Sequence, residues 1–331
     1  MLRNEVQHAE LVLHDRLAQT GPVTVKDRLA ALLVAVLWGV NFLAIDLGLQ
    51  DTPPLVLVAL RFVFVAFPLI LFVQKPPVSW KVLIGIGLFQ SAGQFGCLFT
   101  AMAMGLPTAL APVVLQIQMV FTILFAAILL GERPTRTQLV GAGIGVAGIV
   151  VVAVGRLQDA PGFVALLPLL VCVAGGLSWG IGNVIARSAP AGGGLGIVVW
   201  SATVVPLPML ALSLLLDGPA VIGEAFTSLG WQTAVAVAYT AIAASLVGYS
   251  IWNRLLGKYP AAAVAPFTLL VPPVGILAAV LVLGEEPNAL ELIGSAVLVA
   301  GVAWSTLGGR LLARRAAASA PVASKEPTLV E

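Results

Sequence analysis

Charge is scarce in this chain. Asp, Glu, Lys and Arg make up 10% of its 331 residues, whereas they make up about a quarter of a soluble domain. Hydrophobic residues account for 60%, and the mean hydropathy is +1.05. A water-soluble surface cannot be built from this composition, so we expect a protein that uses the lipid bilayer as its solvent. The formal net charge of +2 is too small to indicate a nucleic-acid partner.

Cysteine and histidine are nearly absent as well. The two cysteines, Cys97 and Cys172, form no Cys-x-x-Cys pair, which argues against a disulfide framework or a cysteine metal site. Both histidines, His8 and His14, precede the apolar part of the chain, so no serine–histidine pair or histidine-ligated metal can form within it. Asp46 is the single aspartate inside an apolar segment, which excludes a catalytic aspartate pair. We therefore expect no enzymatic activity, no cofactor and no metal.

Long apolar segments dominate the chain instead. Each is close to the ~20 residues with which a helix crosses a ~30 Å hydrocarbon layer. There are ten of them, at residues 29–47, 56–73, 82–104, 109–130, 138–154, 163–186, 195–216, 231–252, 264–283 and 290–307. Short connections rich in proline and other turn residues separate them. The predicted fold is an all-α integral membrane protein with ten transmembrane helices.

The chain also repeats itself. The sequence GERPT, starting at Gly131, closes the fourth segment, and GEEPN, starting at Gly284, closes the ninth. WGVN at Trp38 in the first segment has an echo in WGIGN at Trp179 in the sixth. Each block lies at the same place in its half. We therefore predict two repeats of five helices.

Lysine and arginine predict the orientation, because they gather in cytoplasmic loops. With a cytoplasmic N-terminus, the inner loops carry seven basic residues and the outer loops carry one, Arg156. The seven are Lys75, Lys81, Arg133, Arg136, Arg187, Arg254 and Lys258. Five helices are an odd number, so the second repeat is inverted, as in many secondary transporters. We expect residues 28–155 and 156–308 to form these repeats, with both termini in the cytoplasm.

The two ends of the chain differ from the rest. Residues 1–27 are polar and lack the apolar core and cleavage site of a signal peptide, so we expect a polar tail. Residues 309–331 are rich in alanine, arginine, serine and proline, and we expect them to be disordered.

The repeated glycine–glutamate blocks have two explanations. In the structural one, the glycine ends a helix and a capping pair begins the next, Thr135 with Gln138 and Asn288 with Glu291. In the functional one, the glutamate that follows each glycine gates one mouth of a transporter. These glutamates are Glu132 and Glu285.

Residues from about 27 to 307 resemble the drug/metabolite transporter superfamily in its EamA-type branch. The resemblance rests on residues 31–48, 60–62, 127–133, 178–180 and 266–285. Within the branch, the chain most resembles bacterial exporters of cysteine and O-acetylserine, through residues 53–55, 66–68, 114–116, 200–201, 216–218, 247–249 and 251–252. The resemblance implies an exporter of small amino acids that lies in a bacterial inner membrane and works by alternating access. Relatives that carry cationic drugs or other metabolites leave those substrates as the alternative.

Arg61 is the one basic residue inside an apolar segment. It could hold a substrate carboxylate through paired hydrogen bonds. It could instead extend toward the membrane surface, or pair with Asp46 or Asp51 near the same end.

Other polar and aromatic side chains inside the segments are candidates to contact a substrate. Polar groups are costly in hydrocarbon and tend to face a wet cavity or a partner, although each amide could also form an interhelical hydrogen bond. Gln118 is expected to point away from Gln116, so both should not line one cavity. With Arg61, the candidates are Trp38, Asn41, Gln90, Gln94, Gln116, Trp179, Asn183, Trp200 and Tyr249.

Three alternatives stay open at this point. Gly-x-x-x-Gly motifs at Gly141 and Gly176 fit close helix packing, either inside the bundle or between the subunits of a homodimer. A passive channel is the alternative to a carrier, although an inverted repeat favours a carrier. Export could be coupled to protons or could be facilitated exchange.

Overall fold

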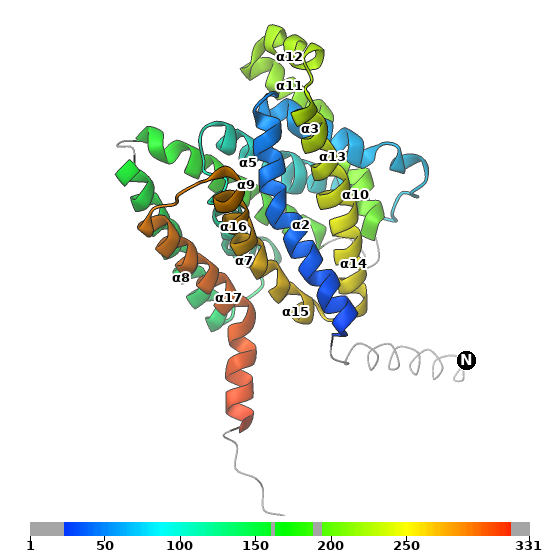
Figure 1. Cartoon of the computed structure of the whole chain (residues 1–331). Coiled ribbons are helices and arrows are strands. Elements are labelled where there is room, and N and C mark those ends of the chain that lie inside the picture. The colour runs from blue at the N-terminus through cyan, green and yellow to red at the C-terminus, as the bar shows by residue number, and fades with distance from the viewer. Residues whose placement is uncertain (1–22, 160–162, 188–193, 319–331) are drawn as a thin grey trace, which may run out of the picture.

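The computed structural model describes residues 23–159, 163–187 and 194–318, and all regular structure in them is helical. Ten helical segments in this part of the chain are long and apolar enough to cross a membrane. This confirms the all-α fold and the ten predicted spans (Figure 1). Most of the tails predicted at either end lies outside the described residues.

Several spans consist of consecutive helical segments, among which η2 and η4 are π-helices and η1, η3 and η5 are 3₁₀-helices. The first repeat contains α2 (Val25–Leu49), α3 (Pro54–Ala66) with η1 (Leu69–Leu71), α4 (Trp80–Gly85) with η2 (Ile86–Gly93) and α5 (Gln94–Ala103), α6 (Ala111–Val114) with η3 (Leu115–Ile117) and α7 (Gln118–Leu130), and α8 (Arg136–Asp159). The second contains α9 (Phe163–Ala186), α10 (Gly194–Ala202) with α11 (Pro206–Leu216), α13 (Trp231–Ala238) with η4 (Tyr239–Val247) and α14 (Gly248–Lys258), α15 (Ala261–Val264) with η5 (Ala265–Leu270) and α16 (Val271–Leu283), and α17 (Ala289–Ala318). A short helix, α12 (Gly218–Thr227), lies beyond the bundle, next to α11 (Figure 1).

The two repeats interlock. The first helix of the first repeat, α2, packs against α13, α14 and α16 of the second repeat. In the same way α9, the first helix of the second repeat, packs against α5 and α7 of the first. The second helices of the repeats, α3 and α11, pack together, and so do the fifth helices, α8 and α17. Each repeat therefore packs against the other through equivalent helices. The fold consists of two inverted halves.

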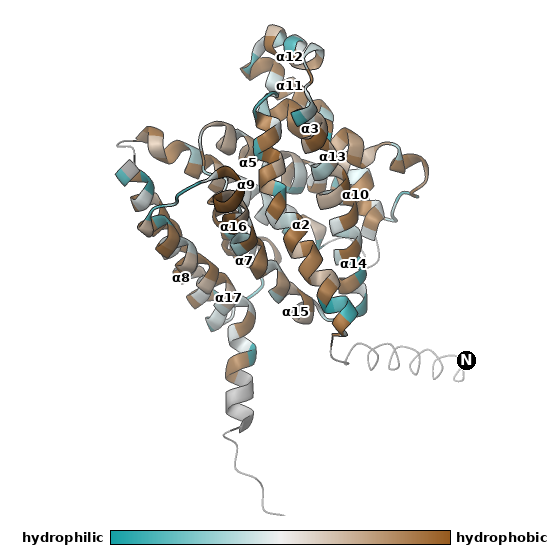
Figure 2. Cartoon of the chain, in the orientation of Figure 1, coloured by the Kyte–Doolittle hydropathy of each residue, from teal (hydrophilic) through white to brown (hydrophobic). Residues whose placement is uncertain are grey.

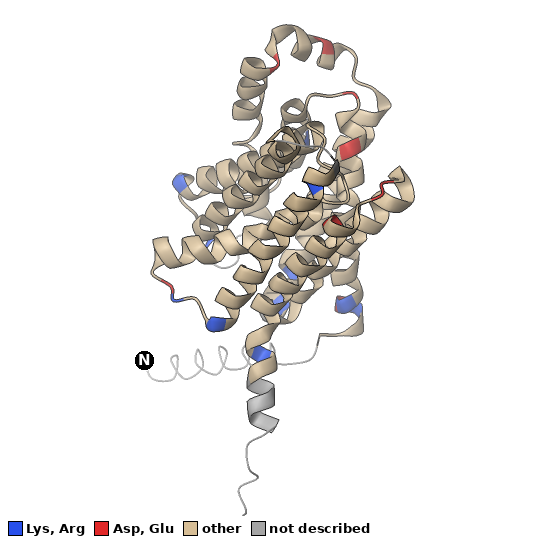
Figure 3. Cartoon of the chain, turned by 90° about the vertical axis from the view of Figure 1, so that its left-hand side faces the viewer, with Lys and Arg blue, Asp and Glu red and all other residues tan. Residues whose placement is uncertain are grey.

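The outer surface of the bundle is apolar, as a lipid-facing surface must be. Large apolar side chains such as Leu207 and Leu281 are 80% exposed, and brown ribbon covers the bundle between polar ends (Figure 2). Basic residues gather toward the end where α2 begins, and acidic residues toward the other end (Figure 3). We name the first the N-terminal end and the second the opposite end. This distribution agrees with the charge argument, but the orientation in the membrane stays a prediction.

The structural explanation of the repeated blocks holds at every predicted capping residue. Gly131 and Gly284 both end a helix with φ of +67°, a conformation that glycine adopts without strain. Thr135 N donates to Gln138 Oε1, and Gln138 N donates to Thr135 Oγ1. The second block repeats this reciprocal pair of bonds between Asn288 and Glu291. Both blocks are therefore a left-handed glycine followed by a capping box.

The small-residue motifs are used inside the bundle. A Cβ added at Gly141, in the first motif, would lie 2.5 Å from Gly301 O on α17, and one at Gly301 would lie 2.5 Å from Gly145 N on α8. In the second motif, Gly176 and its neighbours face α7 and η3. The close contacts are between helices of one chain, so these motifs give no argument for a dimer, and the predicted homodimer stays untested.

Both boundaries of the membrane part differ from the prediction. At the start, Thr24 accepts a hydrogen bond from Asp27 N and caps α2, so the helix begins at Val25, inside the predicted tail. At the end, α17 continues to Ala318, although residues 309–331 were expected to be disordered. Leucine, alanine and arginine have high helix propensity, so the helix that leaves the membrane is extended rather than stopped.

Candidate functional site

A cavity of about 720 Å³ lies between the two repeats. Its wall is mostly apolar, with a small number of polar side chains drawn from both halves, which is typical of a site for a small ligand. Nine of the ten predicted contact residues line it. They are Trp38, Asn41, Arg61, Gln90, Gln94, Gln116, Trp179, Asn183 and Tyr249.

The cavity extends toward the N-terminal end. Its lining includes Ala186 at the end of α9, Gly194 at the start of α10 and Leu256 near the end of α14. Toward the opposite end the lining reaches Pro112 near the start of α6 and does not include the loop that precedes this helix. Fully buried apolar residues, including Leu57 and Phe99, fill the space beyond. The site therefore has a path to one side of the bundle and a packed core on the other.

Arg61 lines this cavity, and among the described residues it neither extends toward the membrane surface nor forms an ion pair with Asp46 or Asp51. Its side chain is buried, with the residue 2% exposed, so it does not extend toward the surface. Its Nη2 donates to Ser245 Oγ at 3.0 Å, and its Cζ lies 4.0 Å from the centre of the Phe95 ring. Asp46 instead accepts a bond from Thr108. The Ser245 hydroxyl and the Phe95 ring hold the guanidinium inside the protein.

Two nitrogens of this guanidinium lack a partner. Arg61 Nε and Nη1 are buried, and neither has a hydrogen-bond acceptor among the described residues. A buried donor without an acceptor costs about 1–3 kcal/mol, and more when it is charged. This arrangement is unfavourable in an empty protein and favours an anionic group in the cavity.

Four of the five predicted amides divide into two groups. Gln90 Nε2 donates to Asn183 Oδ1 at 2.9 Å, and Asn183 Nδ2 donates to Thr122 Oγ1 at 3.0 Å, so these two form interhelical bonds. Asn41 Oδ1 and Gln94 Oε1 are buried and receive no hydrogen bond from the described residues. Residues of the cavity wall thus carry buried acceptors as well as the buried donors of Arg61, and none of these atoms has a hydrogen-bond partner among the described residues.

Aromatic rings form another part of the wall. Trp38 lies 5.2 Å from Tyr249 and 5.4 Å from Trp252, measured between ring centres. Trp179 contacts Phe95 edge to face at 6.5 Å. These rings provide a rigid apolar surface beside the polar groups.

Two predictions about the lining were wrong. Trp200 does not line the cavity, because its indole nitrogen donates to Val73 O at 3.0 Å and its ring packs against Trp80. Gln116 and Gln118 both line it, although they were expected on different faces. The 3₁₀ segment η3 tightens the helix here, which reduces the angle between the two side chains from about 160° to about 120°.

Two π-helical segments were missed by the sequence analysis, and both lie at the cavity. The segments η2 and η4 occupy the same place in the third helix of each repeat. Their wide turns leave carbonyls for other helices, so Ser178 Oγ donates to Phe89 O and Trp38 Nε1 donates to Ala244 O. π-Helical turns often mark functional sites. Ser245, which contacts Arg61, belongs to η4.

Residues 176–180 match the pattern Gly-x-Ser-x-Gly of a nucleophile elbow. That elbow is a sharp turn between a strand and a helix, whereas these residues lie within the continuous helix α9. The hydroxyl of Ser178 is bonded to Phe89 O at 2.8 Å. The serine therefore joins two helices and is not placed as a nucleophile.

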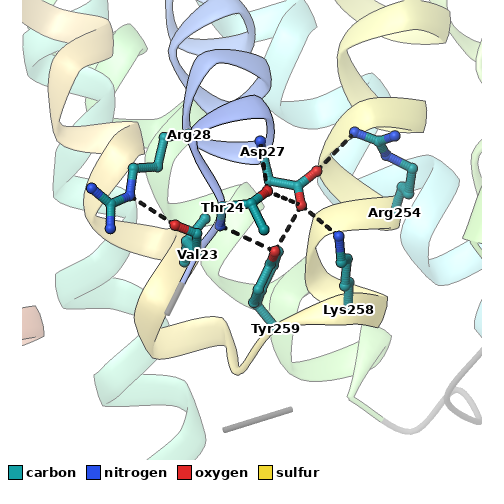
Figure 4. Close-up of polar contacts among 7 residues, drawn as sticks. All are labelled: Val23, Thr24, Asp27, Arg28, Arg254, Lys258 and Tyr259. Carbon is teal, nitrogen blue, oxygen red and sulfur yellow. Dashed lines mark hydrogen bonds and ion pairs between the residues drawn. The ribbon is translucent and has the colours of Figure 1, made fainter. Parts of the chain in front are cut away.

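An ion-pair cluster joins α2 to α14 at the N-terminal end (Figure 4). Asp27 is 3% exposed and accepts hydrogen bonds from Lys258 Nζ at 2.6 Å, Tyr259 Oη at 2.7 Å and Arg254 Nη2 at 3.3 Å. The sequence analysis missed Asp27, because the residue was assigned to the polar tail. Its position in the first turn of a helix was the available signal. The cluster holds two helices of different repeats together beside the mouth of the cavity.

Comparison with known proteins covers nearly the whole membrane part. A sequence model of the EamA-like transporter family matches residues 28–154 and 166–307. A protein of Salmonella typhimurium named "Probable amino-acid metabolite efflux pump" is 40% identical over 290 residues, which is 86% of this chain and 96% of that protein. A "Probable terminal-alkyne amino-acid exporter" of Streptantibioticus cattleyicolor is 28% identical over 303 residues, 88% of this chain and 96% of that protein. A solved crystal structure with 23% identity and a TM-score of 0.56, covering 88% of this chain and 99% of its own, has the same fold.

Proposed function

This chain belongs to the EamA-like transporter family, and we propose that it exports small amino-acid metabolites through the cavity by alternating access. The family membership confirms the resemblance seen in the sequence. Proteins of this family are transporters, so the chain is a multi-pass transporter of the inner membrane and not an enzyme. The substrate, the direction of transport and the residues that bind the substrate belong to the proposal.

One observation carries the proposal, namely the unpaired guanidinium of Arg61 in the cavity wall. A carboxylate is the ligand that a buried guanidinium with free donors binds best, because it accepts several charge-assisted hydrogen bonds at once. Arg61 Nε and Nη1 have no acceptor among the described residues. We assign them to the substrate carboxylate.

The free acceptors complete a site for a zwitterion. Asn41 Oδ1 and Gln94 Oε1 are buried without a donor among the described residues, and an ammonium group has three donors and no acceptor. The remaining wall is mostly apolar or aromatic, with further polar side chains such as Gln116 and Asn253, and accommodates a small side chain. These features support an α-amino acid rather than an anion or a cation alone.

A lipophilic cation fits the cavity less well. Such a ligand is best held by a buried carboxylate, and the described lining residues include no aspartate or glutamate. Arg61 is their one charged side chain. One of the two relatives is named for the efflux of amino-acid metabolites, and the other for the export of terminal-alkyne amino acids. We therefore propose cysteine, O-acetylserine or a similar small amino acid as the substrate, ahead of cationic drugs.

The predicted orientation of the protein in the membrane agrees with export. Basic residues predict that the N-terminal end faces the cytoplasm, and the cavity lining reaches that end. A cytoplasmic mouth is what an exporter needs in order to load its substrate. The inverted repeats then supply the second, outward-facing state.

The test is transport by purified protein in liposomes. The parent should show saturable counterflow of a small amino acid, which a passive channel does not show. Arg61→Lys should reduce this counterflow at least tenfold, since a point charge does not replace the planar donor set. Arg156→Lys is the matched control, because Arg156 lies outside the cavity in an ion pair with Glu291.

A substrate analogue sharpens this test. The amine that lacks the carboxylate should bind weakly to the parent, and its binding should be indifferent to Arg61→Lys. If parent and Arg61→Lys protein transport the amino acid equally, Arg61 does not bind the carboxylate. An imposed pH gradient in the same liposomes would separate proton antiport from facilitated exchange.

A further inference from the structure

A carboxylate closes the opposite end of the bundle across the two repeats. Glu285, in the second glycine–glutamate block, accepts a hydrogen bond from Thr108 N at 2.7 Å through Oε1 and one from Ala109 N at 2.8 Å through Oε2. Thr108 and Ala109 are buried and precede α6 in the first repeat. Both oxygens of one side chain thus bind consecutive amides of the other half.

The neighbouring contacts make this closure continuous. Thr108 Oγ1 donates to Asp46 Oδ1 on α2 at 3.3 Å. The hydroxyls of Thr52 and Thr233, one from each repeat, lie 2.6 Å apart. All of these groups lie on the side of the cavity where its lining stops. The opposite end is closed in this structure. Glu285 is one of the charged groups that join its two halves, and the ion pair between Arg156 and Glu291 is another.

The sequence repeats both sides of this contact, the glutamate and the segment whose amides it binds. Gly284 and Glu285 of the second glycine–glutamate block correspond to Gly131 and Glu132 of the first. The segment Pro107-Thr108-Ala109 has its counterpart in Pro260-Ala261-Ala262, at the same sequence separation as the two blocks. The backbone supports this match, because Leu110 N bonds to Pro107 O and Ala263 N bonds to Pro260 O.

The second copy is arranged differently at the N-terminal end. Both oxygens of Glu132 accept hydrogen bonds from Arg187 Nη1, at 2.7 and 2.8 Å. The Glu132 side chain is 52% exposed and that of Arg187 is 46% exposed. Arg187 follows α9, whose last residue lies at the mouth of the cavity. At the end where the cavity has its path out, the equivalent glutamate is thus held by a surface arginine.

We propose that Glu285 and Glu132 are alternating latches of the two gates. In the state described, Glu285 holds the opposite end shut, and Arg187 holds Glu132 away from the amides that follow Pro260. In the other state, Glu285 releases Thr108 and Ala109, and Glu132 leaves Arg187 and bonds the amides of Ala261 and Ala262. This inference rests on the alternating access of the proposed function and adds the groups that stabilise each state.

The physical reason is the strength of a carboxylate bonded to two backbone amides. Such charge-assisted bonds are about twice as strong as neutral ones, so each latch favours the state in which it is closed. The inverted repeat relates the two gates to each other, and alternating access opens one gate when the other is closed. One latch is therefore closed in each state. Arg187 competes for Glu132 and thereby favours the state described.

The test measures access to the cavity from the side of the opposite end. The reporter is Ser91→Cys, on the cavity wall, in a chain with Cys97→Ala and Cys172→Ala. It is labelled with a membrane-impermeant maleimide in vesicles of known orientation. Glu285→Gln, which loses one acceptor oxygen, should raise the labelling rate from that side at least about fivefold. Glu286→Gln is the matched control, because the adjacent Glu286 is exposed, and it should change nothing.

The ion pair between Glu132 and Arg187 at the N-terminal end gives a more specific test than Glu285 does. Glu132→Gln weakens the second latch and should lower labelling from the side of the opposite end. Arg187→Gln frees Glu132 to close the second latch and should raise the labelling rate from that side. A simple surface ion pair would give both variants the same effect. Equal effects of these two variants, or equal effects of Glu285→Gln and Glu286→Gln, overturn the proposal.

Labelling requires no substrate, so the two proposals fail separately. If Arg61→Lys transports normally while the latch variants behave as expected, the binding proposal falls and the latches stand. If transport depends on Arg61 while labelling ignores all four latch and control variants, the latches fall and the binding site stands.

Discussion

Replacing Arg61 by methionine should abolish transport and leave stability nearly unchanged. Methionine fills much of the same volume without a charge. The substitution removes two buried donors that lack an acceptor among the described residues, which relieves about 2–6 kcal/mol at 1–3 kcal/mol each. It also removes the charged hydrogen bond to Ser245, about 1.5–3 kcal/mol, and the contact with Phe95, about 0.5–2 kcal/mol.

These contributions nearly cancel. Ser245 loses nothing further, because its hydroxyl still donates to Thr240 O at 2.8 Å. At the middle of these ranges, the free energy of unfolding changes by about 1 kcal/mol or less. An arginine that belonged to a structural ion pair would behave differently, since breaking a buried pair costs about 3–5 kcal/mol.

The assay is thermal unfolding of the purified protein in lipid nanodiscs, with and without a small amino acid, beside counterflow in liposomes. The parent should be stabilised by the amino acid, and Arg61→Met should not be. A loss of stability of about 3 kcal/mol or more would refute this reasoning, because it would show that Arg61 supports the fold. Retained counterflow in Arg61→Met would refute it as well.

Three further predictions concern packing, topology and substrate. Gly148→Leu should destabilise the protein because a Cβ at Gly148 meets Leu298 N, whereas Gly143→Leu should be tolerated because nothing lies within 4 Å of a Cβ there; unfolding midpoints of the two variants in nanodiscs check this, and equal midpoints would contradict it. A reporter that is active only outside the cytoplasm should be inactive when fused after Arg310 and active when inserted after Leu216, and the reverse pattern would overturn the orientation. Overproduction should raise extracellular cysteine-pathway metabolites and tolerance to excess cysteine; a gain of resistance to quaternary cations instead would exclude the proposed substrate.

Periodic and repeated features of the sequence predicted the fold well. The ten apolar segments and the paired glycine–glutamate blocks depend on local properties, namely hydropathy, a left-handed glycine and a capping box four residues long. Such properties are set by neighbours in the chain, so they can be read without the tertiary structure. The helix ends were harder to predict, because Asp27 is polar and yet is buried against Lys258 and Tyr259.

The sequence predicted most of the candidate residues that line the cavity, but not the contacts that each of them makes. Polar residues in apolar segments must face something, and this argument correctly placed nine candidates on one cavity. The partner of each residue depends on tertiary contacts that the sequence does not contain. Arg61 meets Ser245 and Phe95 rather than an aspartate. The π-helical segments that place Ser245 and free the carbonyl of Ala244 leave no local sequence signal that we recognise.

The interlocking of the repeats has a consequence for biogenesis. The helix α2 enters the membrane first, but its partners are among the last to be made. Trp38 Nε1 bonds to Ala244 O, and Tyr239 Oη bonds to Leu37 O at 3.1 Å. Until the ribosome has delivered α13 to α16, the polar side of α2 has to remain in lipid without these bonds, at a cost that water cannot relieve. The first half of the chain, synthesised alone, should therefore be a substrate for membrane proteases, and co-expression of the second half should rescue it.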